Sequence, residues 1–104
     1  MENDYEIKKD GSVLTIVLGK ELSVVNAPAL TETLTSYKGQ NLEKVVFDAT
    51  NLTYISSSGV RVILFCKKYL SASSEIVFVN CNEDVLDVLD LVGLRPFITF
   101  VRNC

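Results

Sequence analysis

Two short apolar runs that alternate with helix-like segments constrain the fold of this chain most. Residues 44–48 and 75–80 are rich in valine, isoleucine and phenylalanine, which favour strands. Short apolar runs of this kind are typical of strands covered on both faces. In the segments around them, apolar residues recur at every third or fourth position, as in amphipathic helices. Strands separated by helices form mostly parallel sheets through right-handed crossovers, so we predict an α/β fold.

The two ends of the chain extend the predicted sheet. Residues 5–9 alternate apolar and charged side chains, Asp10-Gly11 is a typical tight turn, and residues 12–18 form the returning strand. This hairpin adds an antiparallel pair, with its first strand at an edge of the sheet. Residues 97–101 supply the last strand. The predicted order is β-β-α-β-α-β-α-β, with five strands and about three helices in a single domain over residues 1–104.

Capping residues predict where the helices begin and end. Asn26 is the expected N-cap of the first helix, and Gly39 is expected to end it. The second helix is expected over about residues 57–70. Asn82 is the expected N-cap of the third helix, which Gly93 ends.

Length and charge narrow the class of protein. The chain has 104 residues, 48% of them hydrophobic, which suits one compact domain. A net charge of −3 argues against a general nucleic-acid or anionic-membrane surface. No apolar run approaches the roughly 20 residues that span a bilayer, and the acidic start of the chain is unlike a secretory signal. We therefore expect a cytoplasmic protein.

The composition offers little for catalysis or for metal binding. The chain has no histidine, which excludes Ser-His and Cys-His nucleophilic machinery. Cys66, Cys81 and Cys104 are widely spaced, so we interpret them as two core residues and one free terminal thiol rather than a metal site. No glycine-rich phosphate loop follows any predicted strand. The sequence thus predicts no enzyme and no cofactor.

Three serines and a glycine lie where the second helix is expected to begin. A short loop after the strand at residues 44–48 leads to these residues, which are Ser56, Ser57, Ser58 and Gly59. Serines at a helix start commonly cap it, which contributes roughly 0.5–2 kcal/mol. The cluster is therefore either a helix cap alone or part of a binding surface.

The segment around these serines resembles the signature of STAS domains, the family shared by sulfate transporters and bacterial anti-sigma factor antagonists. Residues 48–60 read Asp-Ala-Thr-Asn-Leu-Thr-Tyr-Ile-Ser-Ser-Ser-Gly-Val. The family pattern is a strand ending in aspartate, a short loop, and Asp-Ser-Ser/Thr-Gly-Leu at a helix start. Residues 20–23, Lys-Glu-Leu-Ser, resemble the family's Gly-Glu-Leu-Asp loop. The predicted order of elements also matches the family over nearly the whole chain.

This resemblance implies an anti-sigma factor antagonist that is regulated by phosphorylation. In such antagonists the unphosphorylated domain binds an anti-sigma factor that is itself a serine kinase, and so frees the sigma factor. Phosphorylation of the serine two positions before the glycine ends this binding, and a phosphatase restores it. The matching residue is Ser57. A phosphate there would add a charge of about −1.5 to −2, which the interface must desolvate or repel.

Two positions depart from the family pattern. Ser23 and Ser56 stand where antagonists usually carry aspartate, which makes the predicted site less acidic. A different kinase is one interpretation. A STAS interaction module that binds without phosphorylation, in a stress-signalling or lipid-transport complex, is another. A STAS domain that binds a small ligand or a nucleotide is a further alternative.

The second helix adds a predicted partner-binding face. Steps of 100° per residue place one set of side chains toward the core: Ile63, Cys66 and Leu70. Arg61 and Lys68 fall on the opposite side, with Phe65 between them. An aromatic side chain flanked by cations is a typical interface anchor, although the C-terminal segment covering Phe65 is the alternative. The whole predicted partner-binding set is Ser23, Asn26, Ser56, Ser57, Ser58, Gly59, Arg61 and Phe65.

Overall fold

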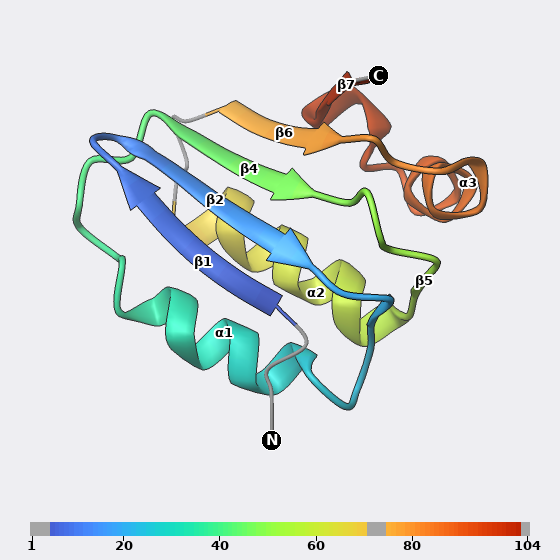
Figure 1. Cartoon of the computed structure of the whole chain (residues 1–104), viewed down its shortest axis with the longest axis horizontal. Coiled ribbons are helices and arrows are strands. Elements are labelled where there is room, and N and C mark those ends of the chain that lie inside the picture. Colours follow the sequence, from blue (N-terminus) through green and yellow to red (C-terminus); the bar gives the residue numbers. More distant parts are fainter. Residues whose placement is uncertain (1–4, 71–74, 103–104) are drawn as a thin grey trace.

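A five-stranded sheet forms the centre of the computed structural model, which describes residues 5–70 and 75–102. The strands lie in the order β1-β2-β4-β6-β7 (Figure 1). The pair β1 and β2 is antiparallel, and the other three pairs are parallel. The predicted α/β fold, its hairpin and the edge position of the first strand are thus confirmed. The strand bounds are β1 (Tyr5–Asp10), β2 (Val13–Leu18), β4 (Lys44–Asp48), β6 (Glu75–Val79) and β7 (Thr99–Val101).

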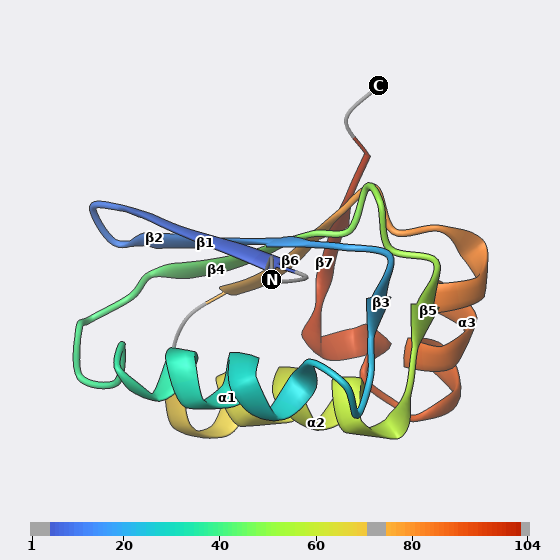
Figure 2. The ribbon, with the colours of Figure 1, turned by 60° about the horizontal axis from the view of Figure 1, so that its bottom comes forward.

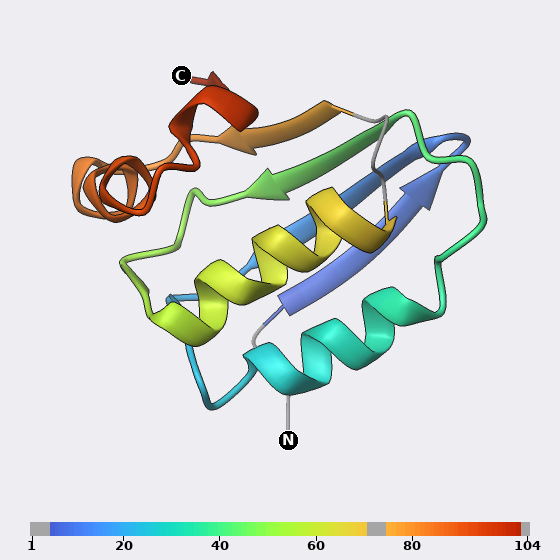
Figure 3. The same ribbon diagram turned by 180° about the vertical axis from the view of Figure 1, so that it is seen from behind.

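Of the three α-helices in the described residues, the first two cover one face of this sheet (Figure 2). The bounds of the three are α1 (Ala27–Thr35), α2 (Ser57–Phe65) and α3 (Glu83–Leu91). Figures 2 and 3 show α1 and α2 side by side across the sheet, with α3 beyond the ends of the strands. A π-helical turn, Cys66–Leu70, prolongs α2, and a 3₁₀ turn, Arg95–Phe97, follows α3. Among the helices of the described residues, none has the length and the apolar character to cross a membrane.

The expectation that the strand at residues 44–48 is covered on both faces is wrong. In β4, Val45 and Phe47 are buried in the core, whereas Lys44, Val46 and Asp48 on the other face are partly exposed. The order β2-β4-β6-β7 moves across the sheet in a single direction. Successive right-handed crossovers that move in one direction lie on the same face, so the opposite face receives no helix within the described chain.

A second, two-stranded sheet joins two segments that the sequence had assigned to loops. It pairs β3 (Glu21–Leu22) with β5 (Tyr54–Ile55) in parallel. From their apolar character, the sequence predicts that Leu52, Tyr54 and Ile55 anchor the loop before α2 to the core. Leu52 and Ile55 are buried there, as is Leu22 of β3. The third predicted anchor, Tyr54, is wrong because its side chain is exposed.

The capping predictions hold for α3 and fail in part elsewhere. The Asn82 side chain accepts a hydrogen bond from the Val85 amide at 2.8 Å, and Gly93 follows the helix with φ +82°. The last strand begins at Thr99 instead of residue 97, because Pro96 lies in the preceding 3₁₀ turn. The first helix ends at Thr35, before the predicted glycine.

Aromatic and thiol side chains fill the core beneath the central strands. The rings of Phe47 and Phe78 stack with centroids 5.0 Å apart. Cys66 and Cys81 are buried, as predicted. Two further predictions concern side chains outside the described part of the chain. They are the core position of Leu70 and the free thiol of Cys104.

We expect both buried thiols to resist alkylation in the native protein at about pH 8. Burial raises the pKa of Cys66 to about 12 and that of Cys81 to about 11, from a usual value of 9.0. The reactive thiolate is therefore scarce at that pH. Because these pKa values lie above the unfolded value, the stability they contribute is complete below pH 9 and is lost as the pH rises toward 11 and 12. Mass spectrometry after iodoacetamide treatment checks this, and labelling of Cys66 or Cys81 without denaturant contradicts it.

Candidate partner-binding site

The two-stranded sheet brings together the two loops that carry the predicted site. Leu22 pairs with Ile55, so Ser23 and Ser56 are the next residues on two neighbouring strands. The Ser56 amide donates a hydrogen bond to the Leu22 carbonyl oxygen at 3.0 Å, which continues the pairing. Figure 2 shows β3 leading into α1 and β5 leading into α2 at this end of the molecule. The two serines that depart from the family pattern therefore lie side by side.

Ser56 caps α2 and leaves the next serine exposed. The Ser56 hydroxyl oxygen accepts hydrogen bonds from the Ser58 amide at 3.1 Å and from the Gly59 amide at 3.4 Å. Ser57 is the first residue of the helix, and its side chain is exposed. Its hydroxyl makes no hydrogen bond within the part of the chain that the structure describes. The Ser56 hydroxyl therefore caps the helix, whereas the Ser57 side chain is exposed to solvent.

We expect Ser56→Ala to lower the free energy of unfolding by about 1 kcal/mol, within the usual range for loss of an N-cap. The alanine leaves the Ser58 and Gly59 amides without the oxygen that now accepts from them. Ser57→Ala is the matched control and should change the stability by less than about 0.5 kcal/mol. Urea unfolding of both variants measures the difference. Equal stabilities of the two variants would show that the cap contributes nothing.

Ser23 and Asn26 are buried and brace the loop between β3 and α1. The Asn26 side-chain oxygen accepts from the Ser23 amide at 2.9 Å, and its nitrogen donates to the Glu21 carbonyl oxygen at 2.8 Å. The Ser23 hydroxyl donates to the Glu21 carboxylate at 2.5 Å and accepts from the Val25 amide at 3.3 Å. Asn26 occupies the N-cap position, but the expectation that its side chain caps α1 is wrong, because the amide turns back toward β3. Both residues position the loop.

Gly59 allows α2 to pack directly on the two-stranded sheet. A Cβ at this position would lie 2.4 Å from the Leu22 carbonyl oxygen and 2.7 Å from Cγ1 of Ile55. Real Cβ atoms do not approach other atoms so closely. Gly59 thus lets the start of α2, which carries Ser57, pack closely against β3 and β5.

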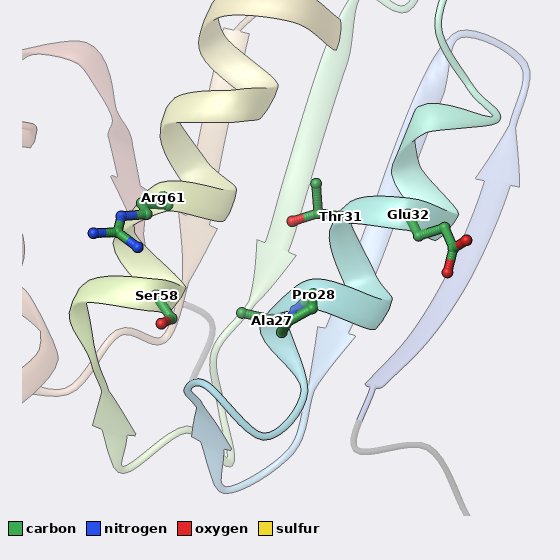
Figure 4. Close-up of a pocket in the computed structure, with 6 residues that line it drawn as sticks. All are labelled: Ala27, Pro28, Thr31, Glu32, Ser58 and Arg61. Atoms are coloured by element: carbon green, nitrogen blue, oxygen red, sulfur yellow. The ribbon is translucent and has the colours of Figure 1, made fainter.

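A groove of about 550 Å³ lies between the starts of α1 and α2. Figure 4 shows Ala27 and Thr31 of α1 facing Ser58 of α2, whereas Glu32 and Arg61 extend outward at the margins. Its remaining lining residue is Pro28. No sequence pattern predicts this groove, because it depends on how two helices pack. It extends the surface around Ser57 toward α1.

The family model described as the STAS domain matches residues 4–104. The chain belongs to the STAS-domain family. The loop, the capped helix start and the exposed Ser57 described above therefore belong to a chain of this family.

Individual relatives agree with this assignment. A protein of Bordetella bronchiseptica with the provisional name anti-sigma factor antagonist BtrV is 31% identical over 87 residues, which are 83% of this chain and 74% of BtrV. The solved structure of the anti-sigma factor antagonist SpoIIAA in its unphosphorylated form aligns with a TM-score of 0.82 at 19% identity, over 93% of this chain and 87% of that chain. The phosphorylated form of SpoIIAA from Bacillus aligns with a TM-score of 0.74 at 18% identity, over 93% and 90%. These structural likenesses concern the fold.

The outer face of α2 in this STAS domain differs in part from the prediction. Arg61 and Lys68 are exposed and Ile63 is buried, as predicted. Phe65, predicted on the exposed side between Arg61 and Lys68, is partly buried and packs against the core. Leu64 is the apolar residue that α2 exposes most. No group of three histidine, cysteine or acidic side chains suited to a metal occurs in the residues that the structure describes.

Proposed function

We propose that this STAS domain is an anti-sigma factor antagonist that works in the cytoplasm by regulated protein binding. In its unphosphorylated form it binds an anti-sigma factor that is itself a serine kinase, and thereby frees a sigma factor. The observation that supports this most is the exposed Ser57 hydroxyl, held at the start of α2 by the Ser56 cap. The name of the relative BtrV and the two phosphorylation forms of SpoIIAA support the same role.

Phosphorylation of Ser57 is the proposed switch. The phosphate adds a charge of about −1.5 to −2 at the N-terminal end of α2, where the helix dipole favours negative charge. The domain itself therefore keeps its fold. The partner surface that packs over a neutral serine must desolvate or repel the same charge, so the complex dissociates. A phosphatase that removes the phosphate restores binding.

The serine in place of the usual aspartate at position 56 is compatible with this switch. Serine and aspartate are comparable N-caps, and Ser56 makes the cap bonds that an aspartate would make. The exchange removes one negative charge beside Ser57, which lowers the repulsion that the added phosphate experiences. Ser23, at the other departing position, is buried beside the Glu21 carboxylate.

Phosphate transfer from the partner tests the proposed function. The chain is incubated with ATP and each serine-kinase anti-sigma factor encoded in the same genome, and its mass is measured. We expect one added phosphate in the wild type and in Ser58→Ala, and none in Ser57→Ala. A stable complex without phosphate would favour the phosphorylation-independent interaction module. If the chain neither gains a phosphate from any of these factors nor forms a complex with any of them, the proposal is contradicted.

The contribution of Phe65 to the partner surface is tested by its truncation. Because Phe65 packs partly against the core, Phe65→Ala should lower the free energy of unfolding by roughly 2 kcal/mol, less than the 3–5 kcal/mol typical of a fully buried phenylalanine. Leu64→Ala is the neighbouring control and should leave stability nearly unchanged. Melting temperature and affinity for the anti-sigma factor are measured together. If Phe65→Ala stays folded but no longer binds, while Leu64→Ala binds normally, Phe65 is an anchor of the interface. If Phe65→Ala is unfolded at room temperature, Phe65 belongs to the core.

A further inference from the structure

We propose that the turn between β3 and α1 carries a second, apolar contact for the same anti-sigma factor. Val24 and Val25 at the tip of this turn insert into an aliphatic pocket on the partner while the partner covers Ser57. This proposal rests on the proposed function, because it names a further part of the same binding surface.

The two valines are exposed to a degree that folding does not explain. Val24 is 70% exposed and Val25 is 72% exposed, and they are adjacent in the chain. Isolated apolar residues on a surface are common. Two consecutive aliphatic side chains, both exposed in the turn beside the candidate site, offer apolar surface that a partner could cover.

Valine is an unusual residue at the centre of a tight turn. The Asn26 amide donates to the Ser23 carbonyl oxygen at 3.2 Å, which closes a four-residue turn with Val24 and Val25 at its two central positions. Glycine, proline, asparagine, aspartate and serine dominate such turns, for steric and hydrogen-bonding reasons that β-branched valine does not share. Residues that depart from local preferences without a gain in packing are expected at functional positions.

The turn is held rigidly in place. Asn26 and Ser23 are buried, and their side chains bond to the backbone and carboxylate of Glu21 and to the Val25 amide, at 2.5–3.3 Å. A loop that is already fixed loses little conformational freedom when it binds. The buried polar network therefore acts as a support that presents the two valines in one geometry.

The turn lies next to the exposed serine. Ser56 follows β5 and Ser23 follows the paired β3, so both loops leave the same end of the two-stranded sheet. Ala27, two residues after Val25, lines the groove opposite Ser58. A partner that covers Ser57 and enters this groove thus reaches the turn. We expect the partner's surface at the turn to carry an aliphatic pocket. Beside it we expect a cation facing Glu32 and an anion facing Arg61, the two residues at the margins of the groove (Figure 4).

Paired substitutions at the turn test the inference. The double variant Val24→Thr, Val25→Thr keeps the shape of both side chains and makes them polar, and Val24→Asp, Val25→Asp adds charge. Calorimetric titration with the serine-kinase anti-sigma factor should show affinity reduced by about tenfold for the first and about a hundredfold for the second. Melting temperatures should stay within a few degrees of the wild type, because neither side chain is buried. Leu91→Asp is the control, since Leu91 is 87% exposed on α3 and should bind normally.

The outcomes separate this inference from the proposed function. If both valine variants bind like the wild type while Ser57→Glu does not bind, the apolar contact is overturned and the antagonist function stands. If the wild type binds none of the anti-sigma factors, both are overturned. If the valine variants bind the anti-sigma factor normally but lose a self-association seen by sedimentation, the turn contacts a second copy of the chain, and the inference is overturned.

Discussion

Replacing Gly59 by alanine should lower the free energy of unfolding by roughly 3 kcal/mol or more, at the upper end of what an added methyl group usually causes. The new Cβ would lie 2.4 Å from the Leu22 carbonyl oxygen. That oxygen already accepts the Ser56 amide at 3.0 Å, so it cannot withdraw without weakening the two-stranded sheet. Urea unfolding measures the loss.

Two controls isolate the cause of this effect. Ser58→Ala changes the adjacent residue without adding an atom near the strands and should be close to neutral. Gly11→Ala introduces a Cβ at φ +62° where no atom lies within 4 Å, so it should cost only about 1 kcal/mol from backbone strain. A Gly59→Ala protein within about 1 kcal/mol of the wild type would contradict the close packing of α2 on the β3–β5 sheet.

Ser57→Glu should reduce affinity for the anti-sigma factor by at least about a hundredfold, because a charge buried at an interface without a partner costs several kcal/mol. Its fold should be unharmed, since an acidic side chain in the first turn of a helix is favourable by about 0.3–1 kcal/mol. Ser57→Ala should bind like the wild type. Calorimetric titration and thermal melting provide the two readouts.

Ser57→Gln separates charge from size in this experiment. Glutamine has nearly the shape of glutamate without its charge, so Ser57→Gln should retain clearly more affinity than Ser57→Glu. Equal losses for both variants would show that the site excludes bulk, and that the electrostatic account of the switch is wrong.

The sheet was predictable from the sequence because its signals are local. The turn at Gly11 and the alternation along β1 identify the hairpin, and the apolar runs identify β4 and β6. The two-residue strands β3 and β5 were missed, since two residues have no periodicity to detect. The open face of the sheet was missed too, although it follows from the order of strands once right-handed crossovers are applied to it.

The candidate site was predictable only where a residue interacts with residues close to it in the sequence. Ser56 caps the helix that it precedes, and a serine cluster at a helix start indicates this directly. Asn26 looked like a helix cap for the same reason, yet its amide bonds back to Ser23 and Glu21 in a loop whose course depends on β5. The groove at Ser58 was beyond prediction, because it forms only when two helices pack.

Release of a sigma factor tests the central claim most directly. A labelled sigma factor is held by its serine-kinase anti-sigma factor, and the chain is added in two forms, unphosphorylated and phosphorylated at Ser57. We predict that the unphosphorylated chain displaces the sigma factor and that the phosphorylated chain leaves it bound. Failure of the unphosphorylated chain to displace it, or equal displacement by both forms, would contradict the account.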